Sequence, residues 1–476
     1  MVLKDKVMEI FKEISSIPRC SGNEIKISQY LMDYAKKHNW QAFQDEVLNV
    51  IIKVEGKNEL KNAKTVILQG HMDMVCVKEQ SSTHDFFRDP LDLYEDSGWL
   101  RAKGTTLGAD NGIALAIALA IASDKNISHP PLELLFTVDE ERGLTGANNL
   151  KPGLLKGQIL LNIDSEDEGV FTIGCAGGRD THIDLPLNYE QNTKKMPTFK
   201  LIIENLSGGH SGIQINQPKA NAIQLATRLL NVLLKNIQDF HLCDIKGGIA
   251  HNAIPREIVV EFCGSDEEKI KNICEEYFII FKNEYSDFEP DMKFSLSKIE
   301  MAKALISSKV SNSIINLLFA LPHGVFTMSQ NMKDLVETSN NLAQVHILNN
   351  NLQILLSQRS SVGSRLDYLT QKIESVAKLA GAKVKSGNGY PAWEPNWNSE
   401  LLKKTKLAYK NIFNKEPKIE VIHAGLECGV IGAKYPGMDM ISFGPTILSP
   451  HSPEEKLKIE DIEKILKFLF ELFTIL

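Results

Sequence analysis

The sequence lacks any block rich in lysine or arginine, and its formal net charge of −7 is mild for 476 residues. Nucleic-acid-binding proteins usually carry a strongly positive face, so we expect no nucleic-acid partner and a small-molecule substrate instead. The sequence also lacks an apolar run of the ~20 residues that a membrane-spanning helix needs. Its longest apolar run, residues 112–122, predicts a buried helix, so we expect no membrane partner.

Cysteine is sparse, and the sequence has no CxxC pair. The seven cysteines are scattered along the chain: Cys20, Cys76, Cys175, Cys243, Cys263, Cys274 and Cys428. Such spacing is typical of reduced, buried thiols in a cytosolic protein rather than of a disulfide framework. Residues 2–14 mix charged and apolar side chains and lack the apolar core of a secretion signal. We therefore expect reduced, inert thiols and a cytoplasmic location.

Length and composition favour a globular protein of two unequal domains. Hydrophobic residues make up 43% of the chain and charged residues 24%, the usual mix for a protein with packed cores. Between residues 65 and 164, strand-like apolar runs alternate with a helical pattern, in the order 65–70, 111–123, 132–138 and 158–164. This alternation predicts the α/β class, with a mostly parallel sheet covered by helices and strands buried on both faces.

The middle of the chain has a different pattern. After residues 174–178, helices are predicted at 219–234, 267–281, 307–320 and 364–380, with strands at 199–206, 257–263, 341–348 and 351–358. We interpret residues 181–389 as an inserted α+β domain, and the order of its elements suggests two similar, ferredoxin-like halves. Because the first pattern resumes beyond the glycine- and proline-rich residues 387–391, the first domain is predicted to be discontinuous, at residues 1–180 and 390–476.

Acidic and imidazole side chains directly follow the predicted strands. They are His71 and Asp73, Glu140 and Glu141, Asp164, and His451, while Asp110 opens the apolar helix. Sites in open α/β sheets gather at the carboxyl ends of strands. Two imidazoles and several carboxylates, without a thiol, suit zinc and are also accepted by manganese or cobalt. Each group alone has an ordinary interpretation, such as a helix N-cap for Asp110, but their joint occurrence predicts a metal site.

Four motifs in this arrangement resemble those of the aminoacyl-histidine dipeptidases, also called cytosol non-specific dipeptidases. They are GHMDMV at 70–75, TTLGADNGIALA at 105–116, DEERGLTGA at 139–147 and SPHSPEE at 449–455. This family belongs to the di-zinc peptidases related to carnosinases and carboxypeptidase G, and the resemblance runs essentially end to end. It implies a zinc-peptidase catalytic domain with an inserted lid. It also implies hydrolysis of unblocked dipeptides, with aminoacyl-histidine as one candidate substrate, by a water bridging two zinc ions.

The same resemblance implies a role for each residue of the cluster. The implied ligands are His71 and Asp164 for one ion, Glu141 and His451 for the other, and Asp110 as a bridge between the two ions. Asp73 would orient His71. Glu140 would act first as general base, taking a proton from the bridging water, and then as general acid toward the departing amine. The resemblance further implies a cis peptide bond between Asp110 and Asn111.

The inserted domain carries three more candidates, and a fourth follows it. His210, in SGGHSG, would be read alone as an incidental residue of a turn, but it is similar to the lid histidine that stabilises the oxyanion in this family. Asn252 in GGIAHNAIP and Arg359 in SQRSS resemble further lid groups, and the planar fork of Arg359 suits a substrate carboxylate, although exposure to solvent is an equal alternative. Glu427 in HAGLECG is a candidate for the substrate amine or, equally, a solvated loop residue.

Two alternatives remain open at the level of sequence. A tripeptidase or an amide-acyl deacylase could use the same two-metal site, because the shape of the pocket sets specificity. A metal-binding scaffold without catalysis is a different class, but the presence of Glu140 beside all five candidate ligands argues against it. A homodimer also stays open, since His210 could act within its own chain or from a partner.

Overall fold

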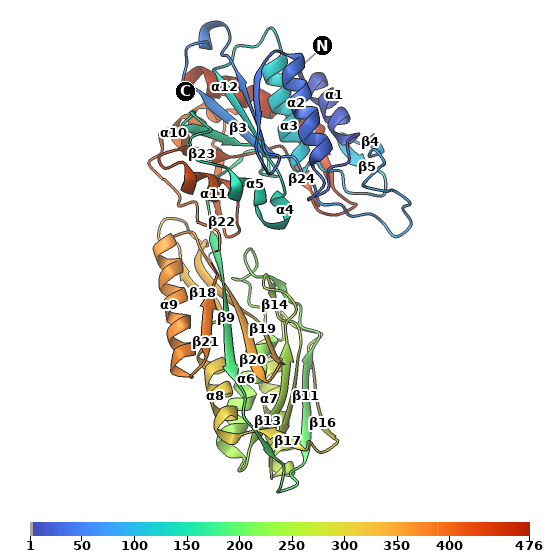
Figure 1. The fold of residues 1–476 in the computed structure, drawn as a ribbon, viewed down its shortest axis with the longest axis vertical. Helices are drawn as coiled ribbons and strands as arrows, with labels where there is room; N and C mark the ends of the chain where they lie inside the picture. Colours follow the sequence, from blue (N-terminus) through green and yellow to red (C-terminus); the bar gives the residue numbers. More distant parts are fainter. Residues whose placement is uncertain (1–2, 388) are drawn as a thin grey trace. The chain divides into compact units, whose positions relative to one another are not determined.

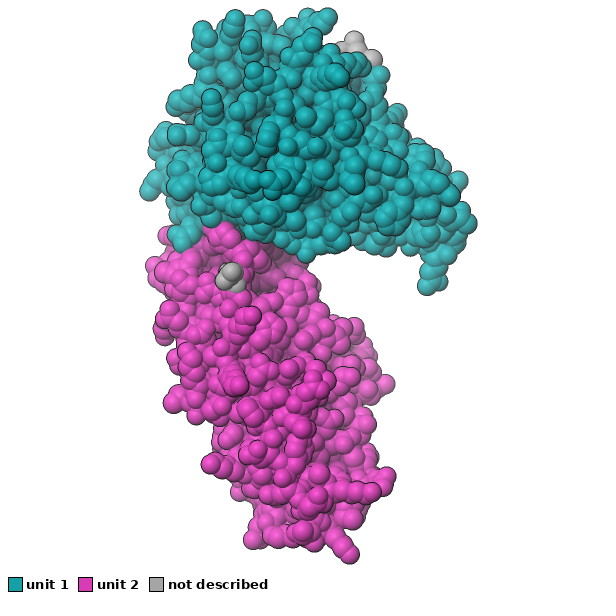
Figure 2. Space-filling view, in the orientation of Figure 1, with its two compact units in different colours: residues 1–175, 393–422, 426–476 teal, residues 176–392, 423–425 magenta. Residues whose placement is uncertain are grey.

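The computed structural model describes residues 3–387 and 389–476. The chain forms two compact units, which Figure 2 colours separately. Unit 1 contains Met1–Cys175, Trp393–Ile422 and Leu426–Leu476, and unit 2 contains Ala176–Ala392 and His423–Gly425. The unit borders thus differ by a few residues from the domain boundaries expected from the sequence, which also placed His423–Gly425 with the first domain. Among the helices of the described residues, none combines the length and apolar character needed to cross a membrane.

A mixed eight-stranded sheet forms the centre of unit 1 (Figure 1). Its strands lie in the order β1 (Gln41–Gln44), β2 (Val50–Val54), β6 (Leu132–Thr137), β3 (Val66–His71), β7 (Ile159–Asn162), β23 (Asp439–Ser442), β8 (Val170–Cys175) and β22 (Lys418–Ile422). The central strands β6, β3, β7 and β23 are parallel, whereas β1 and β2 at one edge are antiparallel. The predicted α/β class is confirmed, and its parallel part is the middle of the sheet.

The central strands and one apolar helix are buried along almost their whole length. Every residue of β3 and of β6 is buried, and in α3 (Ala109–Ser123) only Asp110 is partly exposed. At Gly70 a side chain would collide with Asn111 and Ala114 of α3, so glycine lets the helix approach the end of β3 closely. This close approach brings Asp110 to the carboxyl end of the sheet.

The remaining helices of unit 1 cover this framework. Helix α1 (Leu3–Ser15) packs on α3, α2 (Ile25–Lys37) on β1, and α10 (Glu400–Phe413) on β23 and α12 (Ile459–Ile475). A smaller sheet has the order β24 (Ile447–Leu448), β25 (Lys456–Lys458), β5 (Trp99–Ala102) and β4 (Leu93–Asp96). Short helical segments complete the unit: η1 (Asn58–Leu60), α4 (Glu140–Gly143), α5 (Thr145–Asn149) and α11 (Glu427–Lys434).

Unit 2 is built on a nine-stranded antiparallel sheet. Its main path is β16 (Lys293–Ile299), β11 (Thr198–Glu204), β15 (Ile258–Cys263), β13 (His241–Gly247), β19 (Val336–Leu348), β20 (Asn351–Ser360), β9 (Gly177–Pro186) and β21 (Lys383–Ser386), and β18 (Gly324–Met328) pairs with β19. Two further pairs lie outside it: β10 (Tyr189–Gln191) with β17 (Ala304–Ile306), and β12 (Gly209–His210) with β14 (Ala253–Ile254).

The order of these strands reveals two halves with the same βαββαβ connectivity. One half runs β11, α6 (Ala222–Asn236), β13, β15, α7 (Glu267–Glu284) and β16; the other runs β9, α8 (Ser308–Ala320), β19, β20, α9 (Gly363–Leu379) and β21. In both halves the spatial order of the four strands is 4-1-3-2, and the halves join through β13 and β19. The first half is inserted between β9 and α8 of the second. The doubled, ferredoxin-like arrangement suggested by the order of elements is therefore present.

One expectation about cysteine is wrong. Cys20 and Cys76 form a disulfide across 56 residues of sequence, although the scattered cysteines predicted reduced thiols throughout. The physical reason is tertiary: Cys20 forms an isolated parallel bridge with Met74, which brings the Cα atoms of the two cysteines to 5.6 Å. The other five cysteines are free thiols.

Candidate metal centre

Asp110 lies between two histidines from distant parts of unit 1. Its Oδ1 is 3.1 Å from Nε2 of His71, and its Oδ2 is 3.1 Å from Nε2 of His451. His71 is the last residue of β3, while His451 follows β24 in the C-terminal part of the chain. The two oxygens of one carboxylate therefore face two different imidazoles, the arrangement expected of a group that bridges two cations.

Two further carboxylates complete the cluster, one beside each histidine. Asp164, after β7, places Oδ1 3.4 Å from Nε2 of His71, and Glu141, in α4, places Oε1 3.0 Å from Nε2 of His451. Ligand-type atoms of His71, Asp110 and Asp164 lie within 4.8 Å of one another, as do those of Asp110, Glu141 and His451. The five residues named from the sequence as metal ligands thus come together as two overlapping groups of three.

Glu140 lies beside these groups without belonging to either. It begins α4 next to Glu141, and one of its carboxylate oxygens falls within 4.8 Å of the ligand atoms of His71 and Glu141. Burial raises the pKa of Glu140 well above its usual value, and the neighbouring carboxylates Asp164 and Glu427 raise it further. A carboxylate with a raised pKa takes up a proton more readily than an exposed glutamate, which suits a residue that accepts and returns protons.

Asp73 links His71 to the start of α4. Its Oδ1 is 3.3 Å from Nδ1 of His71, and its two oxygens accept hydrogen bonds from the backbone N–H groups of Glu140 and Glu141. The hydroxyl of Ser21 donates a third bond of 2.7 Å. Burial alone would raise the pKa of Asp73, but His71 and these donors outweigh it and lower the pKa to about 2. A permanently charged Asp73 can orient the imidazole, as expected from the sequence.

Two buried side chains that the sequence did not reveal hold the backbone of the cluster. The Glu455 carboxylate accepts hydrogen bonds from four consecutive backbone N–H groups, those of residues 107–110. Arg19, which is 1% exposed, donates to the carbonyl oxygens of Met72, Asp73 and Gly108. Glu455 stands within the SPHSPEE motif, so the motif pointed at this position, whereas no pattern around Arg19 distinguished it.

Asn111 is a third residue that the sequence did not reveal. Its Oδ1 accepts a bond of 3.2 Å from the backbone N–H of His71, and its Nδ2 donates a bond of 2.6 Å to the carbonyl of Ile163. The side chain therefore ties the ends of β3 and β7 to the start of α3. The peptide bond between Asp110 and Asn111 is cis, which confirms the expectation taken from the family.

Glu427 is completely buried rather than solvated in a loop. Its Oε2 accepts hydrogen bonds of 2.6 Å from Nε2 of Gln69 and from Oγ1 of Thr137, so both neighbouring strand ends hold it. Its Oε1 has no hydrogen-bond partner among the described residues. Burial raises the pKa of Glu427 to about 7.

The chemistry of the cluster fits divalent metal ions. Two imidazoles and three carboxylates supply only nitrogen and oxygen donors, the set that zinc, manganese and cobalt bind. Oε1 of Glu141 is buried, and it faces Nε2 of His451 at 3.0 Å. Carboxylates raise the pKa of His451 to about 11, chiefly through the contacts with Asp110 and Glu141. A cation at this position would replace that proton.

In unit 2, the backbone fixes the orientation of the His210 ring. His210 ends β12, which pairs with β14. Nδ1 of His210 accepts hydrogen bonds from the backbone N–H groups of Gly212 and Ile213, at 3.2 and 3.3 Å. An accepting Nδ1 leaves the proton of the neutral imidazole on Nε2. His210 is therefore set up to donate a hydrogen bond through Nε2.

The other lid candidates lie in different surroundings. Arg359 is buried in β20, and its Nη1 donates to the Tyr390 hydroxyl at 2.9 Å, so the alternative that Arg359 is a surface residue is wrong. Asn252 is exposed in the loop before β14, where its carbonyl accepts from Ser211 N–H at 2.8 Å. His423 is also buried in unit 2, and its Nε2 is 2.7 Å from the Ser339 hydroxyl.

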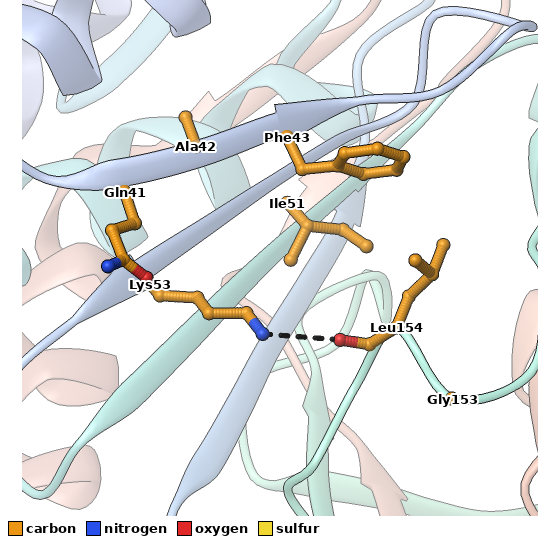
Figure 3. A pocket seen from close by; sticks show the side chains of 7 residues that line it. All are labelled: Gln41, Ala42, Phe43, Ile51, Lys53, Gly153 and Leu154. Atoms are coloured by element: carbon orange, nitrogen blue, oxygen red, sulfur yellow. Dashed lines mark hydrogen bonds between the residues drawn. The ribbon is translucent and has the colours of Figure 1, made fainter.

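A pocket at the edge of the unit 1 sheet is unrelated to these clusters (Figure 3). It has a volume of about 310 Å³ and is lined by Gln41, Ala42, Phe43, Ile51, Lys53, Gly153 and Leu154. Lys53 Nζ donates to the carbonyl of Leu154 at 3.4 Å across it. None of the predicted site residues lines this pocket, so it takes no part in the candidate metal centre.

Known proteins are similar to this chain in sequence and in fold. The model of peptidase family M20/M25/M40 matches residues 67–474. Over 466 residues, 98% of this chain and 96% of the relative, the chain is 40% identical to the cytosol non-specific dipeptidase of Escherichia coli (strain K12). The crystal structure of aminoacylhistidine dipeptidase from Vibrio alginolyticus matches with a TM-score of 0.92 and 38% identity, covering 99% of this chain and 96% of that one. Aminopeptidase PepT from Bacillus cereus ATCC 10987 shares the fold, with a TM-score of 0.57, 15% identity and coverage of 99% and 98%.

Proposed function

The chain belongs to peptidase family M20/M25/M40, and on that premise we propose that it is a two-metal dipeptidase acting on unblocked dipeptides. The observation that carries the proposal is the placement of Asp110, whose two oxygens face His71 and His451 at 3.1 Å each. The substrate class is supported by the end-to-end similarity to a non-specific dipeptidase and to an aminoacylhistidine dipeptidase. A cytoplasmic location and aminoacyl-histidine substrates are part of the same proposal.

The metal ligands are assigned from the two groups of three. His71 and Asp164 would hold one ion, His451 and Glu141 would hold the other, and Asp110 would contribute to both. Zinc fits this donor set, and manganese or cobalt are substitutes. When bound, two such ions lower the pKa of a water and polarise the scissile carbonyl, so that no serine or cysteine nucleophile is needed.

Glu140 moves the proton in this proposal. Burial favours its protonated form, so the carboxylate readily takes a proton from the attacking water and then returns it to the departing amine. Asp73 keeps the ring of His71 in position. Its hydrogen bonds from the backbone N–H groups of Glu140 and Glu141 hold the start of α4 next to the end of β3.

The remaining candidates act on the substrate. Glu427 has one buried carboxylate oxygen without a partner among the described residues, which suits the free ammonium group of a dipeptide. Arg359 is assigned to the terminal carboxylate and Asn252 to a polar contact with the peptide. His210, neutral and with a proton on Nε2, is assigned to the oxyanion that forms during the reaction. In these roles unit 2 is the lid of the enzyme, and a homodimer stays a prediction.

The experiment is a substrate panel on the purified protein, before and after metal removal. We expect hydrolysis of free dipeptides, loss of activity on chelation, and recovery with zinc, manganese or cobalt. An N-acylated dipeptide and a tripeptide test the deacylase and tripeptidase alternatives. Preference for either of them over free dipeptides would overturn the substrate assignment, and full turnover by metal-free protein would overturn the mechanism.

A further inference from the structure

Unit 2 contains two cysteines whose sulfur atoms lie 3.5 Å apart, Cys243 in β13 and Cys263 at the end of β15. The register of the β13–β15 ladder shifts between Leu242 and Asp244, so that Cys243 is the extra residue of a bulge. A bulge redirects a side chain and interrupts the regular pairing of the strands. The thiol of Cys243 is thereby brought beside Cys263, whose own partner in the ladder is His241.

The surroundings of the pair favour a reactive thiolate. Oγ1 of Thr198 is 3.1 Å from the Cys263 sulfur and accepts a hydrogen bond from the Ala302 N–H, so the hydroxyl proton is free to point at the sulfur. The Cys243 thiol, and to a smaller extent Thr198, lower the pKa of Cys263 to about 7 against the opposing effect of burial. The hydrogen bond to Cys263 raises the pKa of Cys243 in turn. The two thiols thus share a single readily lost proton.

Accessibility differs between the two sulfurs. Cys263 is fully buried in a small apolar cluster with Met196 and Leu305, whereas Cys243 is partly exposed. A small oxidant in solution therefore meets Cys243 first, and Cys263 lies directly behind it.

We propose that Cys243 and Cys263 are a redox-active pair that hydrogen peroxide converts into an intramolecular disulfide. The Cys263 thiolate accepts the proton of the Cys243 thiol as the Cys243 sulfur attacks a peroxide oxygen and the O–O bond breaks. The displaced hydroxide then takes that proton and leaves as water, which restores the Cys263 thiolate. The Cys263 thiolate then attacks the sulfenic sulfur of Cys243 and displaces a second hydroxide, which also becomes water. The two thiols lose two protons and two electrons, and the peroxide gains them as two waters. The sulfurs must approach by about 1.5 Å to bond.

The new bond would close a hairpin that carries proposed substrate-binding groups. Asn252 and β14 lie in the segment between Cys243 and Cys263, and β14 pairs with the β12 strand that ends in His210. Oxidation would therefore link the two strands that flank Asn252 and β14, and it would leave the proposed metal ligands unchanged.

The test is peptide mapping of the full-length protein after treatment with hydrogen peroxide at a stoichiometric amount. Remaining thiols are blocked with N-ethylmaleimide before digestion without reductant. We expect a linked peptide containing Cys243 and Cys263, reversed by dithiothreitol, to form about tenfold or more faster than any oxidation of Cys274, a buried thiol with a raised pKa. The Cys274→Ser variant should keep the link.

The Cys243→Ser variant should lose the linked peptide while Cys263 becomes alkylated once the protein is unfolded. Circular dichroism and dipeptidase activity before oxidation show whether each variant is folded. Recovery of Cys243 and Cys263 as two separately alkylated thiols from peroxide-treated wild type would overturn the proposal. Conversion to sulfinic acids without a link, or linkage to Cys20 or Cys76, would overturn it equally.

Discussion

His71 and His451 in unit 1 lie among carboxylates, whereas His210 and His423 in unit 2 lie near Arg359. Burial alone would lower the pKa of His71, but Asp164, Asp110 and Asp73 raise it well above its usual value. In unit 2, burial and then the charge of Arg359 lower the pKa of His210, and the same two causes lower that of His423 to about 3.

The difference shows that the surroundings of an imidazole select its chemistry. Carboxylates around His71 and His451 favour positive charge, which a proton or a metal ion can supply. A buried imidazole beside an arginine stays neutral, and its remaining N–H can donate a hydrogen bond.

Replacing Glu140 by glutamine should have the largest effect. The amide cannot accept the proton of the attacking water, so we expect a rate loss of roughly 10²- to 10⁴-fold with metal content unchanged. Steady-state kinetics and metal analysis of the same preparation measure both quantities. Glu141→Gln is the matched control, because it should lose metal. A Glu140 variant that stays active, or that also loses its metal, contradicts the division of roles between the two residues.

His210→Ala should come next, with a loss in kcat of ~10²- to 10³-fold, typical of one removed oxyanion donor. The loss should appear in kcat more than in KM, since the donor acts on the transition state. His346→Ala is the control within unit 2, because the Nε2 of His346 is hydrogen-bonded to the Gln353 side chain at 3.0 Å. Near-wild-type kcat for His210→Ala would remove unit 2 from the chemistry.

Glu455→Gln should weaken metal binding by ~10- to 100-fold, the usual cost of losing a group that positions a ligand. The two oxygens of its carboxylate accept hydrogen bonds from the N–H groups of residues 107–110. Glutamine has a single side-chain oxygen, so it can accept only some of these bonds. Competition with a chromogenic chelator measures the affinity independently of turnover. The neighbouring Glu454 is exposed and pairs with Arg101 at 3.4 Å, so Glu454→Gln should bind metal normally. Equal affinities for both variants would refute the role of Glu455.

Arg359→Gln should have the smallest electrostatic effect, a change in the pKa of His210 and His423. Removing the nearby cation favours the protonated imidazole, so both pKa values should rise, and His210 should lose its neutral form at a higher pH than in wild type. Titration by NMR of the metal-free protein follows both rings. Arg365→Gln, which breaks the 3.1 Å pair with Glu337, is the control. A fall in either pKa would show that Arg359 does not act by its charge.

Arg359 also distinguishes the ends of the substrate. If it binds the terminal carboxylate, Arg359→Ala should raise KM for free-acid dipeptides more than for their C-terminal amides. Kinetics on matched acid and amide substrates measure this difference. Equal losses on both would reassign Arg359 to the support of its own unit, where it already contacts Tyr390.

Much of the fold followed from local patterns. The apolar runs predicted β3, β6 and β7, and the periodic segments predicted α6, α7, α8 and α9 to within a few residues, because burial on both faces of a strand or on one face of a helix leaves a direct trace in the sequence. The candidate ligands could also be named in advance, since they directly follow these elements.

The features that the sequence missed depend on contacts between distant segments. Arg19 reaches the carbonyls of residues 72, 73 and 108, and no local pattern marks it. Glu455 stands within the SPHSPEE motif, but the N–H groups that it binds lie almost 350 residues away in the chain. The same holds for the disulfide between Cys20 and Cys76, because the spacing of cysteines says nothing about which of them meet.

The sequence by itself determined the type and order of the elements, the nitrogen and oxygen donors at the ends of the strands, and the resemblance to a peptidase family. Only the tertiary structure decided that the two oxygens of Asp110 face different histidines, that one half of unit 2 is nested within the other, and that imidazoles in the two units have opposite shifts in pKa. The reason is that periodicity and propensity act over a few residues. Hydrogen bonds and charges act over a few ångströms between segments that only folding brings together.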